Sequence, residues 1–155
     1  MKINLGCNDL KLDGFLNIDS DPVVNPDVVA DASKLPFDDD SIDEIYAGHL
    51  LEHFAHHEDV LREWHRVLKT GGKITVTVPD TEKALALYSA GEISLDLLNQ
   101  VVFGANDRER QHHHQIFNKE ILLVQMSKYF KTEIVDDSPH AFFKVKWQTI
   151  AIGIK

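Results

Sequence analysis

Three short, partly apolar segments of the sequence end in residues that could hold a polar ligand. Each segment has the length of a buried β-strand and is followed by glycine, asparagine or aspartate. They are Lys2–Leu5 followed by Gly6, Cys7 and Asn8, Phe15–Ile18 followed by Asp19, and Asp27–Ala30 followed by Asp31. Because the carboxyl ends of parallel strands meet at one edge of a sheet, these residues predict a ligand site at that edge.

The residue types at these positions suit a nucleoside. Gly6 lets a ligand approach the backbone closely, and Asn8 tolerates the positive φ that turns the chain beneath it. The carboxylate of Asp19 can accept hydrogen bonds from both hydroxyls of a ribose. Asp31 can accept a hydrogen bond from the exocyclic amino group of adenine, while the backbone of Ala32 reads the edge of the ring.

A nicotinamide dinucleotide is disfavoured as this ligand. The dinucleotide fingerprint needs three glycines that open a helix. Here Asn8 stands in place of the second glycine, and Leu12-Asp13-Gly14 gives no helical start.

The next part of the chain predicts an α/β unit of a parallel sheet. A fourth strand is expected over Ile42–Ala47, and a helix over His56–Lys69, where the apolar residues fall on one stripe. Thr70-Gly71-Gly72 should end this helix, because glycine accepts the left-handed conformation that caps a helix C-terminus. The β-branched alternation of Ile74–Val78 then predicts a strand.

Further helices and two strands are expected after Pro79. The helices are Thr81–Ser89, Ser94–Phe103 and a third from its cap Asn118 to about Tyr129, and the strands are Thr132–Val135 and Lys144–Ile154. A turn containing Ser138-Pro139 joins the two strands, and so short a connection permits only antiparallel pairing. No repeat or linker divides the chain, so residues 1–155 are expected to form a single domain.

Composition narrows the class of protein. A chain of 155 residues with 43% hydrophobic content can bury one core but not comfortably two. The formal net charge of −9 disfavours nucleic acid and anionic membrane surfaces as partners. A single cysteine excludes an internal disulfide, and no apolar run has the length of a membrane span or secretory signal. These features predict a cytoplasmic protein.

Six segments of the sequence follow one another in a characteristic order. They are Ile3-Asn4-Leu5-Gly6-Cys7, Asn17-Ile18-Asp19, Val29-Ala30-Asp31-Ala32-Ser33-Lys34-Leu35-Pro36-Phe37, Ser41-Ile42-Asp43-Glu44-Ile45, His49-Leu50-Leu51-Glu52-His53 and Val67-Leu68-Lys69-Thr70-Gly71-Gly72-Lys73. In this order they resemble the motifs of class I S-adenosylmethionine-dependent methyltransferases, and most closely the small "type 11" group. The resemblance implies a minimal methyltransferase fold of the α/β class: a Rossmann-like, mostly parallel sheet with helices and a C-terminal antiparallel hairpin.

The resemblance also implies a cofactor and a set of binding residues. The cofactor is S-adenosylmethionine. The motifs do not identify the methyl acceptor, which is expected to be a small molecule or a protein, with oxygen and nitrogen as the candidate atoms. The implied contacts are Gly6, Cys7 and Asn8 with the methionine part, Asp19 with the ribose, Asp31 and Ala32 with the adenine, and Gly48 and His49 with the pocket after the fourth strand. Asn8 departs from the family pattern, which has a second glycine there.

Two histidines are candidates for a catalytic base. Methyl transfer needs a base only when the attacking oxygen or nitrogen must lose a proton, and an imidazole titrates near neutrality. His49 and His113 are the candidates, and the loop 105–115 is expected to face the acceptor. Arg108 and Arg110 of this loop could steer an anionic acceptor toward an otherwise acidic protein.

Two other functions remain open from the sequence. The first is a non-catalytic accessory protein that binds S-adenosylmethionine or a nucleoside. The second is a metal-binding protein, since His49, His53 and His57 would share one face of a continuous helix and three more histidines lie at 112–114. The single cysteine and the absence of an HExxH motif disfavour a metal protein, so no metal site is assigned.

The connections between the first strands are too short for covering helices. Nine residues, Gly6 to Gly14, separate the first two strands and eight, Asp19 to Pro26, separate the next two. Parallel strands usually need a crossover of about a dozen residues or more. One face of the sheet should therefore need another cover, either a second subunit in a homodimer or the helices of Thr81 to Phe103.

Overall fold

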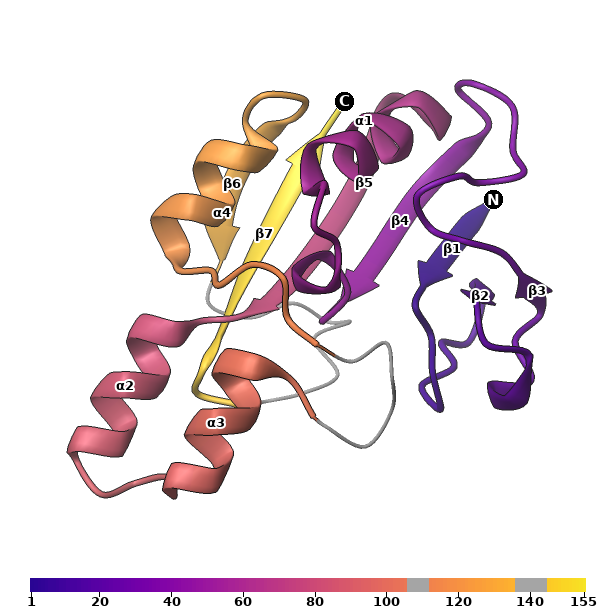
Figure 1. Cartoon of the computed structure of the whole chain (residues 1–155). Coiled ribbons are helices and arrows are strands. Elements are labelled where there is room, and N and C mark those ends of the chain that lie inside the picture. Colours follow the sequence, from indigo (N-terminus) through magenta and orange to yellow (C-terminus); the bar gives the residue numbers. More distant parts are fainter. Residues whose placement is uncertain (106–111, 136–144) are drawn as a thin grey trace.

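The structure is a computed structural model that describes residues 1–105, 112–135 and 145–155. These residues form a seven-stranded sheet in the order β3-β2-β1-β4-β5-β7-β6 (Figure 1). The strands are β1 (Lys2–Leu5), β2 (Leu16–Asp19), β3 (Val28–Val29), β4 (Ile42–Gly48), β5 (Leu68–Pro79), β6 (Lys131–Val135) and β7 (Gln148–Ile154). The first five run parallel, and β7 pairs antiparallel with both β5 and β6. The expected mostly parallel sheet with a C-terminal antiparallel pair is confirmed.

The helices lie close to their predicted positions. They are α1 (His57–Val67), α2 (Thr81–Ser89), α3 (Leu95–Phe103) and α4 (Lys119–Met126), with short 3-10 turns η1 (Pro22–Val24) and η2 (Leu51–His53). The side chain of Asn118 accepts a hydrogen bond from the backbone N–H of Ile121, so its predicted role as the cap of α4 is confirmed. The turn at Ser138-Pro139 lies outside the described residues.

The predicted end of α1 is wrong. The helix ends at Val67, and Leu68 is already extended with φ −73° and ψ 134°. Leu68 pairs with Ile42 of β4, and the pairing shifts register before it resumes between Lys73 and Glu44. Gly71 and Gly72 thus lie within an irregular part of β5. Sheet pairing outweighs two further helical residues here, because it satisfies the backbone and buries Leu68 completely.

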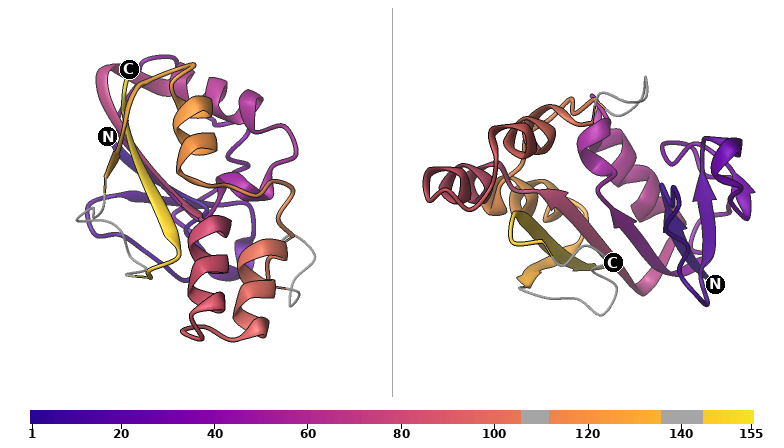
Figure 2. Two further views of the ribbon diagram at one scale, coloured as in Figure 1. Left: turned by 90° about the vertical axis from the view of Figure 1, so that its left-hand side faces the viewer. Right: turned by 90° about the horizontal axis from the view of Figure 1, so that it is seen from below.

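The main core lies between the sheet and the helices α1 and α4. Both helices lie on the same side of the sheet (Figure 2). The buried residues of α1 are Val60, Leu61, Trp64 and Val67, which matches the predicted stripe. The side chains that face them from the central strands include Ile3, Ile45 and Ile74, which follow one another across the sheet and are fully buried. This packing fixes the carboxyl ends of the strands at one edge.

The other face of the sheet is polar near its centre and carries no helix of the described residues. Glu44 forms ion pairs with Lys2 and Lys73 at 2.7 Å each, one on either neighbouring strand. The buried Asn4 side chain donates to Asn17 Oδ1 at 2.9 Å and to the carbonyl oxygen of Leu10 at 2.8 Å, so the loop after β1 folds over this face.

The helices α2 and α3 do not cover this face, so that prediction is wrong. They pack against each other through Ala84, Leu98 and Val101 and extend away from β1, β2 and β3 (Figure 1). The polar side chains of the open face hydrogen-bond across strands, which lowers its need for an apolar cover. The homodimer stays a prediction, which light scattering can check. Among the residues that the structure describes, no helix has the length and apolar character to cross a membrane.

Candidate functional site

The loops after β1 and β2 meet at the carboxyl edge of the sheet. Gly6 and Asn8 both adopt positive φ, 62° and 44°, which turns the chain sharply after β1. The backbone N–H of Asn8 donates to Asp19 Oδ2 at 2.8 Å, and that of Asp21 donates to Asp19 Oδ1 at 2.9 Å. The Asp19 carboxylate therefore ties the two loops together and holds one N–H on each oxygen.

Packing adds to the preference for glycine at Gly6. A Cβ at this position would lie 2.7 Å from Cδ1 of Leu50, the residue that follows β4 and His49. The left-handed conformation and this close approach both favour glycine. Cys7 beside it is buried, and its N–H donates to the carbonyl of Ile18 at 3.0 Å. Burial, with a smaller contribution from Asp19, raises the pKa of the Cys7 thiol to about 11, so the thiol is neutral.

The turn Asp31–Ser33 follows β3 at the same edge. Asp31 Oδ1 accepts hydrogen bonds from the backbone N–H and the hydroxyl of Ser33, at 2.8 and 2.7 Å. The carbonyl of Ala32 accepts a buried hydrogen bond from the indole Nε1 of Trp64 at 2.9 Å. Helix α1 thus anchors the turn that is expected to bind adenine.

Gly48 and His49 stand at the end of β4. Leu5 pairs with Ala47, so Gly6 and Gly48 leave the sheet side by side. His49 has a positive φ of 51°, and its Nε2 lies 3.1 Å from Oε1 of Gln148. The ring of Trp147 meets the His49 imidazole edge-on, with 5.6 Å between ring centroids. Burial lowers the pKa of His49, and the hydrogen bond with Gln148 acts in the opposite direction.

A carboxyl group and two further imidazoles lie beside His49. Glu52 is 1% exposed, and its Oε1 is 3.8 Å from Nδ1 of His49. Burial raises the pKa of Glu52 to about 8. The rings of His53 and His113 are 5.0 Å apart between centroids. Burial lowers the pKa of both imidazoles, that of His113 to about 4.

The structure brings most predicted site residues to one edge of the molecule. They lie at the carboxyl ends of four strands: Gly6, Cys7 and Asn8 follow β1, Asp19 ends β2, Asp31 and Ala32 follow β3, and Gly48 ends β4 directly before His49. His113, the second predicted catalytic residue, reaches this edge through its contact with His53. Arg108 and Arg110 lie outside the described residues, as do the other residues of 106–111. The cofactor and catalytic roles of these residues stay predictions.

His49, His53 and His57 do not belong to one continuous helix, which the metal-binding hypothesis assumed. His49 follows β4, His53 belongs to η2, and His57 begins α1, so three separate elements carry these residues. The His57 ring packs against Phe117 at 6.1 Å between centroids, and its nitrogens have no hydrogen-bond partner in the described part of the chain. The spacing i, i+4, i+8 therefore gives no shared face.

Sequence reasoning missed several residues at this site. Glu52 was part of a recognised motif but had no assigned role. Trp147 and Gln148 reach His49 because β7 runs antiparallel beside β5, which pairs Gln148 with Pro79. Asp80 is buried after β5 and accepts a hydrogen bond from the Thr149 hydroxyl at 2.5 Å. No local pattern marks Trp147 or Gln148, whereas an aspartate directly after a strand could have been noted for Asp80.

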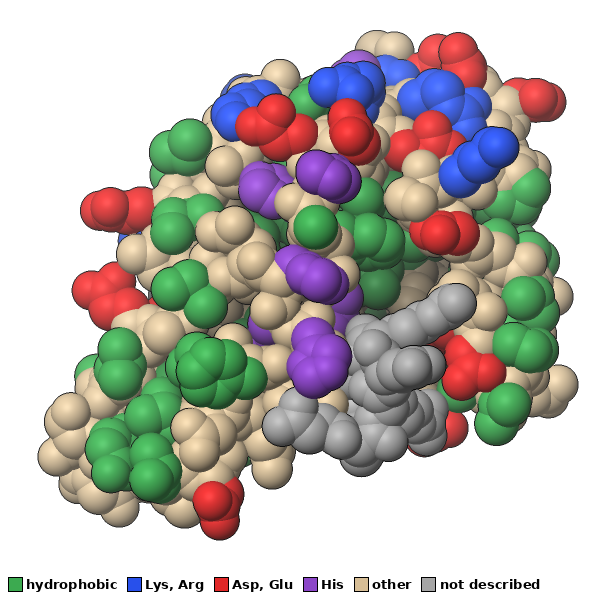
Figure 3. Space-filling model, in the orientation of Figure 1, with side chains coloured by type: hydrophobic (Ala, Val, Ile, Leu, Met, Phe, Trp, Pro, Cys, Tyr) green, Lys and Arg blue, Asp and Glu red, His purple; other side chains and the backbone are tan. Residues whose placement is uncertain are grey.

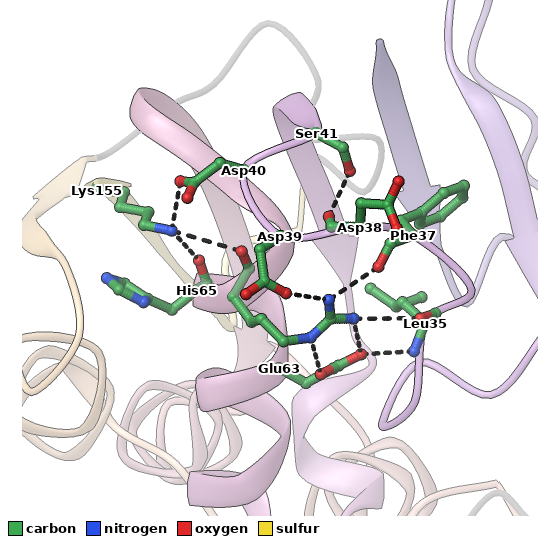
Figure 4. Close-up of polar contacts among 10 residues, drawn as sticks. Leu35, Phe37, Asp38, Asp39, Asp40, Ser41, Glu63, His65 and Lys155 are labelled. Carbon is green, nitrogen blue, oxygen red and sulfur yellow. Dashed lines mark hydrogen bonds and ion pairs between the residues drawn. The ribbon is translucent and has the colours of Figure 1, made fainter.

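A surface hollow of about 620 Å³ lies along helix α1, and its lining extends from Ser33 of the turn after β3 to the residues before β4. Its lining includes Asp39, Asp40, Glu63, Arg66 and Lys155, which form the hydrogen-bonded network of Figure 4. These residues lie near the amino end of β4, whereas ligands of open α/β sheets bind at the carboxyl ends. The network stabilises the fold and does not belong to the candidate site.

Comparison with known proteins agrees with this architecture. Residues 13–76 match the family described as "Methyltransferase domain". The 2-methoxy-6-polyprenyl-1,4-benzoquinol methylase of Pongo abelii is 30% identical over 133 residues, which cover 82% of this chain and 38% of that protein. The ubiquinone/menaquinone biosynthesis C-methyltransferase of Laribacter hongkongensis is 41% identical over 54 residues, which cover 35% of this chain and 22% of that protein. The chain thus spans well under half the length of these curated relatives.

Solved structures share the fold across almost the whole chain. A protein from Pyrococcus horikoshii aligns with a TM-score of 0.68 and 19% identity, covering 99% of this chain and 80% of that one. A SAM-dependent methyltransferase from Thermotoga maritima, titled a possible histamine N-methyltransferase, gives 0.66 and 16% identity, covering 99% and 81%. These likenesses show that the chain shares the fold of these solved structures, and residues 13–76 resemble the family described as a methyltransferase domain.

Proposed function

We propose that the chain binds S-adenosylmethionine across the carboxyl ends of β1, β2 and β3 and transfers its methyl group to a small-molecule acceptor beside His49. One observation carries this proposal: the hydrogen bond from the Asn8 N–H to Asp19 joins a left-handed turn and a carboxylate at the edge of the sheet. Ligands of open α/β sheets bind at this edge, and such a carboxylate recognises a ribose.

The residues at the edge fit the chemical groups of S-adenosylmethionine. Each Asp19 oxygen accepts one backbone N–H and keeps a second lone pair for a ribose hydroxyl. Asp31 is exposed and retains the oxygen Oδ2 for the amino group of adenine. Asn8 replaces a family glycine yet adopts the positive φ that a glycine would supply. The departure at this position is thus compatible with the turn that the cofactor needs.

Methyl transfer requires little of the protein beyond positioning the cofactor and the acceptor. The cofactor supplies a methyl group on a positively charged sulfur, which is already activated for transfer. The chain has to hold the acceptor in line and exclude water. The Gln148 and Trp147 side chains fix the ring of His49 at the end of β4, which suits His49 to orient the acceptor.

Relatives support a small-molecule acceptor. Their names describe a methylase of a polyprenyl benzoquinol and a C-methyltransferase of ubiquinone and menaquinone biosynthesis. The negative charge of this chain also opposes a nucleic-acid acceptor. Simple phenols and hydroquinones are therefore the first acceptors to test, with amines as the comparison.

We also propose a cytoplasmic location, which fractionation of cells can check.

Calorimetry with S-adenosylmethionine tests the cofactor site. Removing the Asp19 carboxylate deletes two charge-assisted hydrogen bonds to the ribose, each worth about 1.5–3 kcal/mol. Asp19→Ala should therefore weaken binding by about 100-fold or more. Asp13→Ala changes an exposed aspartate of the neighbouring loop and should bind like the parent chain. Because Asp19 also holds two loop N–H groups, Asp19→Asn and a thermal melt of each variant separate lost binding from lost folding.

Two outcomes would overturn this proposal at different points. No heat of binding at about 1 mM cofactor would contradict the cofactor site. Binding without release of S-adenosylhomocysteine in the acceptor screen would favour the non-catalytic accessory protein instead.

A further inference from the structure

Glu52 is buried without the hydrogen bonds that a buried carboxyl group normally has. Within the residues that the structure describes, neither of its carboxylate oxygens has a hydrogen-bond partner. Burial keeps this group protonated when no cation is present, and a cation beside it would stabilise the ionised carboxylate. The methyltransferase chemistry proposed above gives Glu52 no task. Its environment therefore points to a positively charged ligand.

The imidazoles of His53 and His113 lie beside Glu52, and a backbone carbonyl orients each ring. His53 Nδ1 lies 3.2 Å from the carbonyl oxygen of His112, and His113 Nδ1 lies 3.0 Å from that of Val101. A carbonyl only accepts hydrogen bonds, so each Nδ1 carries the proton and the second ring nitrogen keeps its lone pair. Histidine ligands of metals are commonly oriented in this way. In Figure 3, histidine side chains gather near the middle of the face shown.

The three side chains have the spacing of an open metal site. One ligand atom from each of Glu52, His53 and His113 lies within 4.8 Å of the other two. The centre of a triangle with sides of that length is about 2.8 Å from each corner, against the 2.0–2.2 Å of zinc bonds to nitrogen and oxygen. Each ligand atom would have to move inward by at most about 0.8 Å, which side-chain rotation can supply.

We propose that Glu52, His53 and His113, called here the Glu52 cluster, bind a divalent transition-metal ion of the zinc type. Two imidazoles and one carboxylate form a known zinc ligand set that leaves a fourth position open. Imidazole ligands disfavour magnesium and calcium, which prefer oxygen. This ligand set differs from the set His49, His53 and His57 considered from the sequence, because it contains a carboxylate, Glu52, and a histidine from a distant part of the chain, His113.

The Glu52 cluster lies beside His49, because Glu52 Oε1 is 3.8 Å from Nδ1 of the His49 imidazole. A hydroxyl of the acceptor could bind at the open position of the ion and lose its proton more easily. This role rests on the proposed methyl transfer, whereas metal binding itself does not.

Cobalt and zinc titrations of the whole chain test the proposal. The protein is prepared without a histidine tag and stripped with a chelator. Co²⁺ should bind with one-to-one stoichiometry and give the visible absorption of a site with low coordination number, and Zn²⁺ should displace it with a Kd of about 1 µM or lower. Metal analysis of protein purified without a chelator gives the resident ion.

Matched variants test whether the ion binds at the Glu52 cluster. Glu52→Gln keeps the shape of the side chain but removes the anionic ligand, and His113→Ala removes one imidazole. Each should weaken Zn²⁺ binding by about 100-fold or more, since loss of even an outer-shell partner often costs 10–100-fold. His112→Ala removes an exposed imidazole from the same run of histidines and keeps the backbone carbonyl that anchors His53, so it should bind Zn²⁺ like the parent chain. Circular dichroism in chelator checks that each variant is folded.

The results separate this inference from the proposed function. Absence of one-to-one binding below about 1 mM Zn²⁺ would overturn the metal site, as would equal binding by Glu52→Gln and His112→Ala. Calorimetry with S-adenosylmethionine on the metal-free chain reports on the cofactor site alone. A chain that binds Zn²⁺ at the Glu52 cluster but no cofactor would contradict the proposed function and leave the metal site standing.

Discussion

The hydrogen bond between Trp64 and Ala32 joins the core of the protein to its candidate cofactor site. The Trp64 ring is fully buried in α1, and its indole N–H donates to the carbonyl of Ala32 in the turn expected to bind adenine. Trp64→Phe retains an aromatic ring but removes the donor and part of the ring volume. The substitution therefore tests both the stability of the core and the anchoring of the turn.

The expected cost of this substitution is the sum of two effects. A buried carbonyl that loses its donor costs about 1–3 kcal/mol. The space left by the missing part of the indole costs roughly a further 1 kcal/mol. The free energy of unfolding should therefore fall by about 2–4 kcal/mol, which corresponds to a melting temperature lower by roughly 4–16 °C in a chain of this size. The untethered turn should weaken S-adenosylmethionine binding by about 10-fold.

Urea unfolding and calorimetry measure the two effects, and Val67→Ala is the matched control. Val67 is fully buried in the same helix, so its truncation also destabilises the core but leaves the hydrogen bond to Ala32 in place. Cofactor affinity should fall in Trp64→Phe and stay near the parent value in Val67→Ala. The reasoning is refuted if Trp64→Phe unfolds within about 0.5 kcal/mol of the parent, or if both variants bind the cofactor equally well.

Two further predictions concern charged groups away from the site. Arg66 holds two carboxylates and two backbone carbonyls in the network of Figure 4, so Arg66→Lys, which loses the planar fork, should cost about 1–2 kcal/mol in urea unfolding. Arg62→Lys changes an exposed pair with Asp59 and should stay within about 0.5 kcal/mol; equal losses would contradict the assigned role of the network. Hydrogen bonds from Lys69 and the N-terminal amino group lower the pKa of Asp43 to about 2, so its stabilising contribution is present above its unfolded pKa and is lost as the pH falls toward 2. The urea midpoint of Asp43→Asn should therefore fall less between pH 4 and pH 2 than that of the parent chain, and parallel curves would exclude this contribution.

The strand-end residues of the candidate site could be predicted from the sequence because each lies at the end of its own strand or directly after it. Gly6, Asn8 and Asp19 needed only two local patterns, a buried strand and a polar residue after it, together with the rule that parallel strands end at one edge. The structure then places Asn8 and Asp19 in direct contact. The short connections likewise predicted the missing helices, because chain length limits what can cross between parallel strands.

The predictions that failed depended on competition between elements. The glycine pair at Gly71-Gly72 is a local signal for a helix end, but pairing of Leu68 with β4 ends α1 earlier. The helices α2 and α3 have enough apolar residues to cover a sheet, yet they pack mainly against each other. Local patterns give no free-energy difference between such alternatives, because that difference is summed over contacts made in the whole fold.

The sequence by itself determined the class of fold and the edge of the sheet where a nucleoside cofactor would bind, since both follow from periodicity and from residues next to one another in the chain. Only the tertiary structure decided which groups surround His49. Gln148 reaches it through the antiparallel register of β7, and His113 meets His53 although α1, β5, α2 and α3 lie between them in the chain. The burial of Glu52 was also decided there, because the cost of a carboxyl group depends on what packs around it and not on its neighbours in sequence.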